Sequence, residues 1–441
     1  MKSWWRSSAV LAASLGWVLS SGCAPDDPFD VEGPRSCEIP DQNEWVYSLM
    51  QRMYLFADDM PQVDPRAYDS PQELMADLRV EPDRWSRISD KATTNALFQE
   101  GKSIGTGFRT RRDEQNRVVV AEVKNDSPAS ALGMRRGDIV QAIAGLTTER
   151  IDEESLWGDV YGENVPGVTV ELEIEQADGT MLPVSITKDW IDIETVPLHD
   201  IIDNEGQSVG YVYFASFLSS SPEELNVAFA DFKEAGVRQV VVDLRYNSGG
   251  LVSTARHFMH LLAGGVASGQ TAYKVRYNDS LASENTDRTL SRLDQSLPEV
   301  DHVVFITTGT SISASELLIN GVAAHIPISI VGDDTGGKPV GSKHFEFCDS
   351  IARPITFQVL NANDDGDYFD GLSVDCPAPD DLTRELGDPE EASLAVALHR
   401  LATGECLDVP QGEEASVAEP LGLRTPVPAS DDEQSLPLGM H

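Results

Sequence analysis

The chain is poor in basic residues. Among its 441 residues, 33 Lys and Arg stand against 73 Asp and Glu, which gives a formal net charge of −40 at pH 7. A nucleic-acid-binding protein needs clustered Lys and Arg to neutralise phosphates, so this balance excludes that class. It also argues against docking on anionic lipid through a basic patch. We interpret the acidic surplus as solvated surface, which indicates nothing about fold or chemistry.

Long apolar runs are also missing. An apolar stretch over residues 9–19 follows Lys2 and Arg6, and it is shorter than the ~20 residues of a membrane-spanning helix. This pattern predicts a secretory signal peptide over residues 1–22. Its end, LSSGC, resembles the lipobox of bacterial lipoproteins, with serine where an aliphatic residue is usual. The resemblance implies that Cys23 carries a lipid and anchors an exported chain in the cell envelope; the alternative is an ordinary cleaved signal peptide.

Cysteine pairs spaced as CxxC are absent, which argues against a zinc site, and we expect no metal and no cofactor. Four cysteines follow Cys23, and an even number favours disulfides in an oxidising compartment. Four cysteines allow three pairings. We predict Cys348–Cys376, which would staple a local loop, and Cys37–Cys406, which would tie the N-terminal segment to the last domain.

Changes in periodicity divide the rest of the chain. Residues 23–36 are rich in Pro and Asp and suit a tether. Apolar residues at intervals of three and four predict an N-terminal helical segment over residues 37–100, and alternation predicts strands over residues 101–189. Residues 190–406 alternate apolar β-branched runs with helical stretches, which predicts an α/β domain with parallel strands and crossover helices. Residues 407–441 read as a disordered acidic tail. The expected strands of the α/β part are 209–214, 238–244, 302–307 and 328–331, and the expected helices are 222–235, 254–263 and 315–324.

Three turns that follow these strands carry the polar residues of interest. The first, DLRYNSGG over residues 243–250, could expose backbone N–H groups as an oxyanion hole, or it could be a simple tight turn. The second, TSISASE over residues 310–316, contains a Ser-x-x-Glu capping box but more hydroxyls than capping needs. The third, GDDTGGKPVG over residues 332–341, has the spacing of a phosphate-binding loop. Pro339 follows its lysine and supplies neither hydroxyl nor N–H, so we reject a nucleotide site.

The β-rich region resembles a PDZ domain, a small β-barrel with helices. Gly105-Thr106-Gly107-Phe108 is similar to the loop that binds a peptide carboxylate, and SPA…LGMRRGDIV over residues 127–140 is similar to the PDZ signature. Glycines let consecutive N–H groups converge on a terminal carboxylate while the sheet edge accepts the peptide as a strand. The alternative is that these glycines only shape a hairpin.

Together, the three turns and the PDZ-like region resemble the C-terminal processing peptidases, or tail-specific proteases, including their lipoprotein branch. The resemblance implies a ClpP/crotonase-like core with a mixed sheet. It implies Ser313 as the nucleophile and Lys338 as the base, with an oxyanion hole made by the backbone N–H groups of Ala314 and of Gly249 or Gly250. None of the eight histidines falls in these motifs, which argues against a Ser–His–Asp triad.

A Ser–Lys dyad needs a neutral lysine, so its pKa of about 10.4 must be lowered towards 7–8 by desolvation. Many members of the family carry Gln four residues after the lysine to orient it, and this chain has Ser342. The resemblance predicts an exported endopeptidase acting on proteins with free, apolar C-termini. The alternative is an impaired peptidase that serves as a PDZ peptide-binding scaffold.

Overall fold

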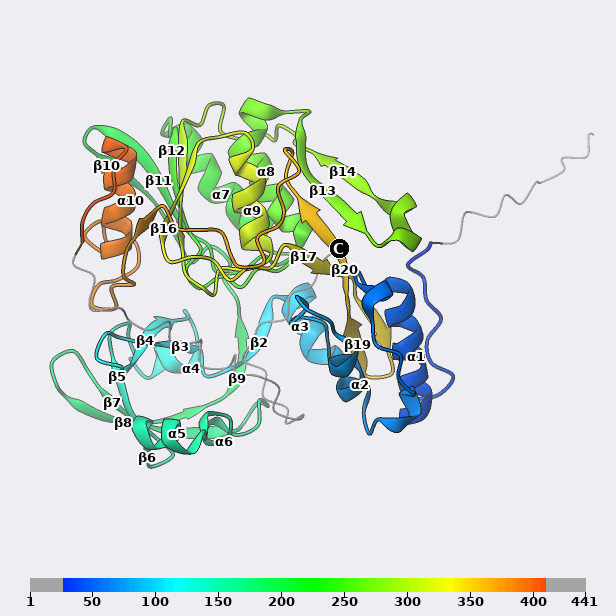
Figure 1. Cartoon of the computed structure of the whole chain (residues 1–441). Helices are drawn as coiled ribbons and strands as arrows, with labels where there is room; N and C mark the ends of the chain where they lie inside the picture. Colours follow the sequence, from blue (N-terminus) through cyan, green and yellow to red (C-terminus); the bar gives the residue numbers. More distant parts are fainter. Residues whose placement is uncertain (1–26, 410–441) are drawn as a thin grey trace, which may run out of the picture. The chain divides into compact units, whose positions relative to one another are not determined.

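The computed structural model describes residues 27–409, of which residues 33–409 form one unit (Figure 1). The predicted signal peptide, Cys23 and the chain beyond residue 409 lie outside the described residues. None of the helices in the described range has the length and apolar character needed to cross a bilayer.

Helices dominate the N-terminal segment, as the periodicity predicts. In α1, Trp45, Leu49 and Met53 form a buried stripe, and Ser70 caps α2 by accepting a hydrogen bond from the Glu73 N–H at 3.2 Å. The segment also contains a strand that the sequence did not predict, β1, which pairs antiparallel with β19 of the α/β part. The elements are α1 (Ile39–Met53), η1 (Ala57–Asp59), η2 (Pro65–Ala67), α2 (Pro71–Leu78), β1 (Arg87–Asp90) and α3 (Lys91–Glu100).

The β-rich module follows between two paired strands. β2 and β9 run antiparallel to each other, so the chain enters and leaves the module side by side. In β7, Val170, Leu172 and Ile174 are buried and alternate with exposed glutamates. The elements are β2 (Lys102–Gly105), β3 (Phe108–Arg112), β4 (Val118–Val123), α4 (Pro128–Ala131), β5 (Ile139–Ile143), β6 (Leu146–Thr147), α5 (Thr148–Glu154), α6 (Trp157–Tyr161), β7 (Thr169–Glu175), β8 (Met181–Thr187) and β9 (Asp189–Asp192).

The α/β part is built on a mixed sheet in the order β10-β11-β12-β15-β16-β21. β11, β12, β15 and β16 are parallel neighbours, and β10 is antiparallel at the edge. Helices cover both faces, with α10 on one side of the strands and α7, α8 and α9 on the other (Figure 1). Consecutive residues of β12 show this: Val240 and Val242 pack towards α7–α9, and Val241 packs towards α10.

The predicted strands and helices of this part occur near their expected bounds. A second sheet, in the order β14-β13-β20-β17, lies apart from the first and includes the strand that follows Lys338. The elements are β10 (Leu198–Asn204), β11 (Gln207–Tyr213), α7 (Ser221–Glu234), β12 (Gln239–Asp243), α8 (Val252–Ala267), β13 (Thr271–Tyr277), η3 (Asp279–Glu284), β14 (Thr286–Thr289), β15 (His302–Thr307), α9 (Ala314–Ala323), β16 (Ile328–Gly332), β17 (Val340–Ser342), β18 (Phe345–Phe347), β19 (Ser350–Arg353), β20 (Ile355–Leu360), β21 (Cys376–Pro377) and α10 (Ala392–Thr403).

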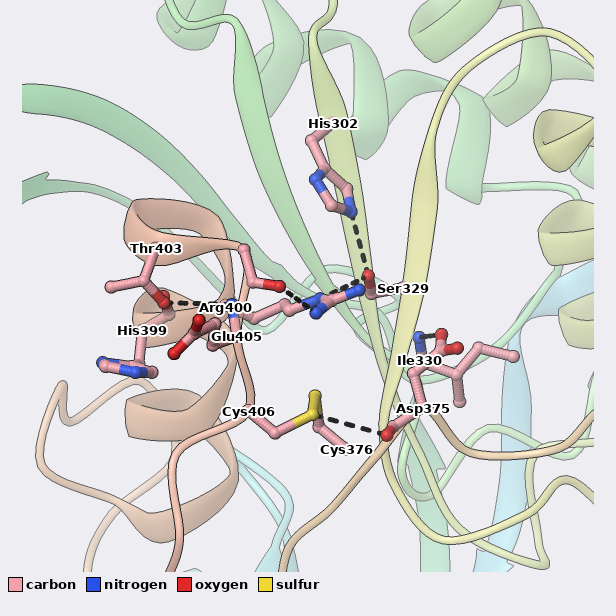
Figure 2. Close-up of a disulfide and its surroundings, with 11 residues drawn as sticks. His302, Ser329, Ile330, Asp375, Cys376, His399, Arg400, Thr403, Glu405 and Cys406 are labelled. Carbon is pink, nitrogen blue, oxygen red and sulfur yellow. Dashed lines mark hydrogen bonds between the residues drawn. A yellow bond between two sulfur atoms is a disulfide. The ribbon is translucent and has the colours of Figure 1, made fainter.

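The predicted cysteine pairing is wrong. The structure joins Cys37 to Cys348 and Cys376 to Cys406. Cys37 precedes α1, whose Trp45 packs against Phe347 beside Cys348 at a ring distance of 4.6 Å. Figure 2 shows the second bond, where Cys406 follows α10 and meets the edge strand β21. The loop argument failed because the chain between Cys348 and Cys376 passes through two further sheets: β19 pairs with β1 and β18, and β20 pairs with β13 and β17.

Candidate active site

Hydroxyl side chains join the turns that follow β12 and β15. Ser311 Oγ donates to the Leu244 carbonyl at 2.7 Å, and Ser315 Oγ donates to the Asn247 carbonyl at 2.9 Å. Thr310 Oγ1 likewise donates to the carbonyl of Arg245 at 2.8 Å. The surplus of hydroxyls in residues 310–315 therefore has a structural use: it fixes one turn against the other.

Ser313 differs from these neighbours. Its side chain is buried, and its Oγ has no hydrogen-bond partner within the part of the chain that the structure describes. Its backbone has φ 60° and ψ −112°, a conformation that costs a non-glycine residue about 1–3 kcal/mol. Such strain persists only where the surroundings impose it. Ser313 thus presents an unengaged hydroxyl at the N-terminus of α9, where the helix favours negative charge.

Glu316 connects the serine to the lysine. One carboxylate oxygen, Oε2, accepts the backbone N–H of Ser313 at 2.8 Å and that of Lys338 at 2.7 Å. The two nitrogens are therefore within two hydrogen-bond lengths of each other. The other oxygen, Oε1, accepts from the Gly337 N–H at 2.7 Å and from Thr335 Oγ1 at 2.6 Å. Burial raises the pKa of Glu316, and these four hydrogen bonds oppose that rise.

Lys338 is buried among charged groups of both signs. Its side chain is buried, and this burial is the main reason that its pKa lies well below the usual range. The nearby guanidinium groups of Arg87 and Arg353 lower the pKa further, while Asp83 and Glu316 partly oppose them. A lysine with a lowered pKa is neutral at lower pH and can accept a proton.

Gly337 lets the lysine turn pass close to another segment. A Cβ atom at Gly337 would lie 2.2 Å from the carbonyl oxygen of Phe369, and its φ of +79° suits glycine. The turn therefore requires glycine at this position, immediately before Lys338.

The double-glycine turn offers a backbone donor next to Ser313's helix. The Gly249 N–H donates to Asn247 Oδ1 at 2.8 Å, so it is already engaged. Within residues 27–409, neither Gly250 nor Ala314 shows a hydrogen bond from its backbone N–H. Of the two glycines, Gly250 is thus the better candidate for an oxyanion donor.

Replacing Gly250 with alanine is expected to lower the free energy of unfolding by about 2–4 kcal/mol. The added Cβ would lie 2.2 Å from the carbonyl oxygen of Phe217, and φ is +141°. Gly269 is a matched control, because its φ is +85° and nothing lies within 4 Å of an added Cβ. We expect Gly269→Ala to cost only about 1 kcal/mol in denaturant unfolding. Equal losses in the two variants would contradict the close approach to Phe217.

Known families match two parts of the chain. The model described as peptidase family S41 matches residues 208–376, and the model of the peptidase S41 N-terminal domain matches residues 41–87. These two parts of the chain belong to peptidase family S41.

The chain is similar to several curated proteases. It is 27% identical over 296 residues to a carboxyl-terminal-processing protease of Picosynechococcus sp., covering 66% of the chain and 67% of that protein. It is 24% identical over 298 residues to the Synechocystis sp. protein of the same name, covering 66% and 65%. The match thus spans about two thirds of each relative's length. These relatives support a serine-type peptidase of the C-terminal processing kind.

Solved structures show the same fold. A putative S41 protease from Bacteroides fragilis gives a TM-score of 0.67 at 24% identity, covering 82% of this chain and 97% of that one. The photosystem II D1 C-terminal processing protease gives a TM-score of 0.50 at 19% identity, covering 76% and 92%.

The other predicted site residues of this chain lie as follows. Ser342 is buried in β17, opposite Ile355 of β20. In the β-rich module, the loop Gly105–Phe108 meets the SPA motif: a Cβ at Gly107 would lie 2.2 Å from that of Ser127, and the Ala129 N–H donates to the Thr106 carbonyl at 3.0 Å. The structure thus brings together the two motifs that resemble a PDZ domain.

A hollow of about 280 Å³ lies beside the glycine turn, since Leu251, which follows Gly250, lines it. Helix α3 contributes four of its lining residues. Its lining is partly apolar and carries no acidic or basic side chain other than a histidine. The residues are Thr94, Asn95, Phe98, Gln99, Ser219, Leu251 and His344.

Sequence reasoning missed two parts of this site. It interpreted Glu316 only as a helix cap, although the Ser-x-x-Glu spacing was the available signal. It also missed the turn before β1, where Trp85 lies with its ring centre 5.8 Å from Lys338 Nζ. No local pattern marks that turn. Among residues 27–409, no group of His, Cys, Asp and Glu could hold a metal ion.

Proposed function

We propose that this chain is an exported serine endopeptidase that cleaves proteins near their C-termini with a Ser313–Lys338 dyad. The observation that carries the proposal is a shared hydrogen-bond acceptor: one carboxylate oxygen of Glu316 accepts the backbone N–H groups of both Ser313 and Lys338. The unengaged Ser313 hydroxyl and the lowered pKa of Lys338 supply the nucleophile and the base.

Acylation begins when Ser313 Oγ attacks the carbonyl carbon of the scissile peptide bond and Lys338 Nζ takes the hydroxyl proton. The negative charge that develops on the carbonyl oxygen is stabilised by the N–H groups of Ala314 and Gly250. A donor of this kind typically lowers the barrier by about 2.7–4 kcal/mol. The tetrahedral intermediate collapses, the ammonium of Lys338 protonates the leaving amine, and an ester to Ser313 remains.

Deacylation repeats these roles with water. Lys338, neutral again, takes a proton from a water molecule whose oxygen attacks the ester carbonyl. The same N–H groups hold the second oxyanion. The intermediate then releases the new C-terminal carboxylic acid, and the proton on Lys338 returns to Ser313 Oγ. Ser342 would orient the lysine where other family members use Gln.

The β-rich module would select the substrate. We propose that residues 101–189 act as a PDZ domain, in which the loop Gly105–Phe108 binds the terminal carboxylate of an apolar tail. The hollow beside Leu251 would accept an uncharged side chain near the scissile bond. A lipid on Cys23 would hold the exported enzyme at a membrane.

Ser313→Ala is expected to abolish cleavage of an unfolded protein with an apolar C-terminus. Because Ser313 Oγ has no hydrogen-bond partner in the described chain, the free energy of unfolding should hardly change. The rate for the unmodified protein should rise with pH through the lowered pKa of Lys338, because only the neutral amine accepts a proton.

Ser311→Ala serves as the matched control. Its hydroxyl donates to Leu244 and accepts from the Thr308 N–H at 3.1 Å, so the variant should lose stability yet still cleave. Equal cleavage by the unmodified protein and Ser313→Ala would refute the proposed function. Absence of cleavage in both, with tail peptides still bound, would favour a peptide-binding scaffold instead.

A further inference from the structure

The turn Asp83–Arg87, at the end of the N-terminal domain, is firmly fixed to the peptidase core. Asp83 Oδ1 accepts the backbone N–H groups of Trp85 at 2.8 Å and Ser86 at 3.0 Å, which shapes the turn. Ser86 Oγ accepts the Ile355 N–H of β20 at 2.9 Å. The strand β1 that follows then pairs with β19. The core therefore fixes the position of the turn at Ser86 and along β1.

Two side chains of this turn reach the loop that carries the base. Arg84 Nη2 donates to the carbonyl of Gly336 at 2.7 Å, two residues before Lys338. The Trp85 ring lies 5.8 Å from Lys338 Nζ and 6.4 Å from the ring of Phe369. At 5.8 Å the ring is near the limit of cation–π attraction, so its larger effect on the amine is to exclude water.

The charged groups around Lys338 come from several elements. Arg87 of β1 and Arg353 of β19 are direct partners across the two strands, and both disfavour a charged amine. Asp83 of the turn and Glu316 of α9 favour the charged amine to a smaller extent. The N-terminal domain thus places three groups around Lys338: the ring of Trp85, the guanidinium of Arg87 and the carboxylate of Asp83.

We propose that the turn Asp83–Arg87 is part of the active site, and that Trp85 and Arg87 are positioning residues that keep the Lys338 amine dry and uncharged. The proposal rests on the proposed function, because it assigns these residues a role towards the catalytic base. It gives the N-terminal domain a part in catalysis. Trp85 needs no contact with the substrate for this role.

The test compares the pH dependence of kcat in Trp85→Ala, Trp85→Leu and Arg87→Met. Water should reach Lys338 in Trp85→Ala and raise the midpoint of the acid limb by about one pH unit, while the alkaline plateau stays. Trp85→Leu keeps apolar cover and should remain close to the unmodified protein. Arg87→Met removes a positive charge and should also raise the midpoint, so the proposal stays testable if Trp85→Ala does not fold.

Trp157→Ala is the matched control, because Trp157 also lies 5.8 Å from a cation, Arg112, but in the β-rich module. It should leave the midpoint unchanged. Lower kcat with unchanged midpoints in the Trp85→Ala and Arg87→Met variants would overturn the proposal and leave the turn a structural role only.

A second measurement separates this proposal from the proposed function. In a Ser313→Ala background, lysine labelled with ¹³C at Cε reports the protonation of Lys338 by NMR without any cleavage. A Lys338 midpoint that rises in Trp85→Ala and Arg87→Met supports the turn's role even if the unmodified protein proves inactive. An unchanged midpoint overturns it even if Ser313-dependent cleavage is found.

Discussion

The Glu316→Gln variant is expected to lose at least about 100-fold in kcat/KM. Each oxygen of Glu316 accepts two hydrogen bonds, and the amide nitrogen of Gln can accept none. At least two buried donors would lose their acceptor, at about 1–3 kcal/mol each. Every 1.36 kcal/mol added to the activation barrier lowers the rate tenfold. A partial loss of alignment between Ser313 and Lys338 that adds about 2.7 kcal/mol to the barrier therefore gives the 100-fold loss. Steady-state kinetics and denaturant unfolding would measure both losses.

Glu73 offers a control at the same position of another helix. It is the third residue of α2, and its Oε2 accepts the Asp69 N–H at 3.2 Å on the exposed surface. Gln can also form this capping contact, so Glu73→Gln should change stability by less than about 0.5 kcal/mol and leave kcat/KM unchanged. If Glu316→Gln behaved like Glu73→Gln, the carboxylate would be no more than a helix cap.

Lys338→Met is expected to abolish activity and yet to make the protein more stable at neutral pH. The unfolded chain carries a charged lysine at pH 7, and burial in the folded state disfavours that charge. Each tenfold reduction in the proton affinity of the folded amine corresponds to about 1.4 kcal/mol. Methionine fills a similar volume without this cost.

The difference in the free energy of unfolding between Lys338→Met and the unmodified protein should become smaller as the pH rises. Between the lowered pKa of Lys338 and about 10.4, the unfolded chain binds a proton at this lysine that the folded chain does not. The free energy of unfolding of the unmodified protein therefore rises with pH relative to Lys338→Met, and the two converge above that window. Lys102→Met, at a lysine side chain that is 42% exposed, is the control and should change the free energy of unfolding by less than about 0.5 kcal/mol. A pH-independent difference would contradict a buried, neutral Lys338.

Local patterns predicted the parts of the fold that depend on local sequence. The β-branched run at Val240–Val242 requires burial on both faces, and it forms a central strand between two helical layers. The glycines and hydroxyls that follow the strands mark turns wherever they occur, so the segments around Gly250 and Ser313 could be found without a structure.

Long-range partners could not be predicted in this way. The cysteine pairing depends on which two sheets receive β19 and β20, and the length of the loop between the cysteines carries no such information. Glu316 also accepts hydrogen bonds from the lysine turn that follows β16. The spacing between Ser313 and Glu316 carries no information about that turn, so it predicts only the helix cap. Trp85 lies in an irregular turn with no periodicity. Long-range contacts bring it to Lys338: the register of β1 with β19 and the hydrogen bonds of Arg84 and Ser86 to the core.

The contact between Arg84 and Gly336 joins residues 252 positions apart, and the Cys37–Cys348 bond joins residues 311 apart. During synthesis the N-terminal turn emerges long before the lysine loop that it covers. Contacts of this sequence separation form late and slowly in folding. A growing chain therefore cannot place the turn Asp83–Arg87 over the lysine loop until about three quarters of its length has been made.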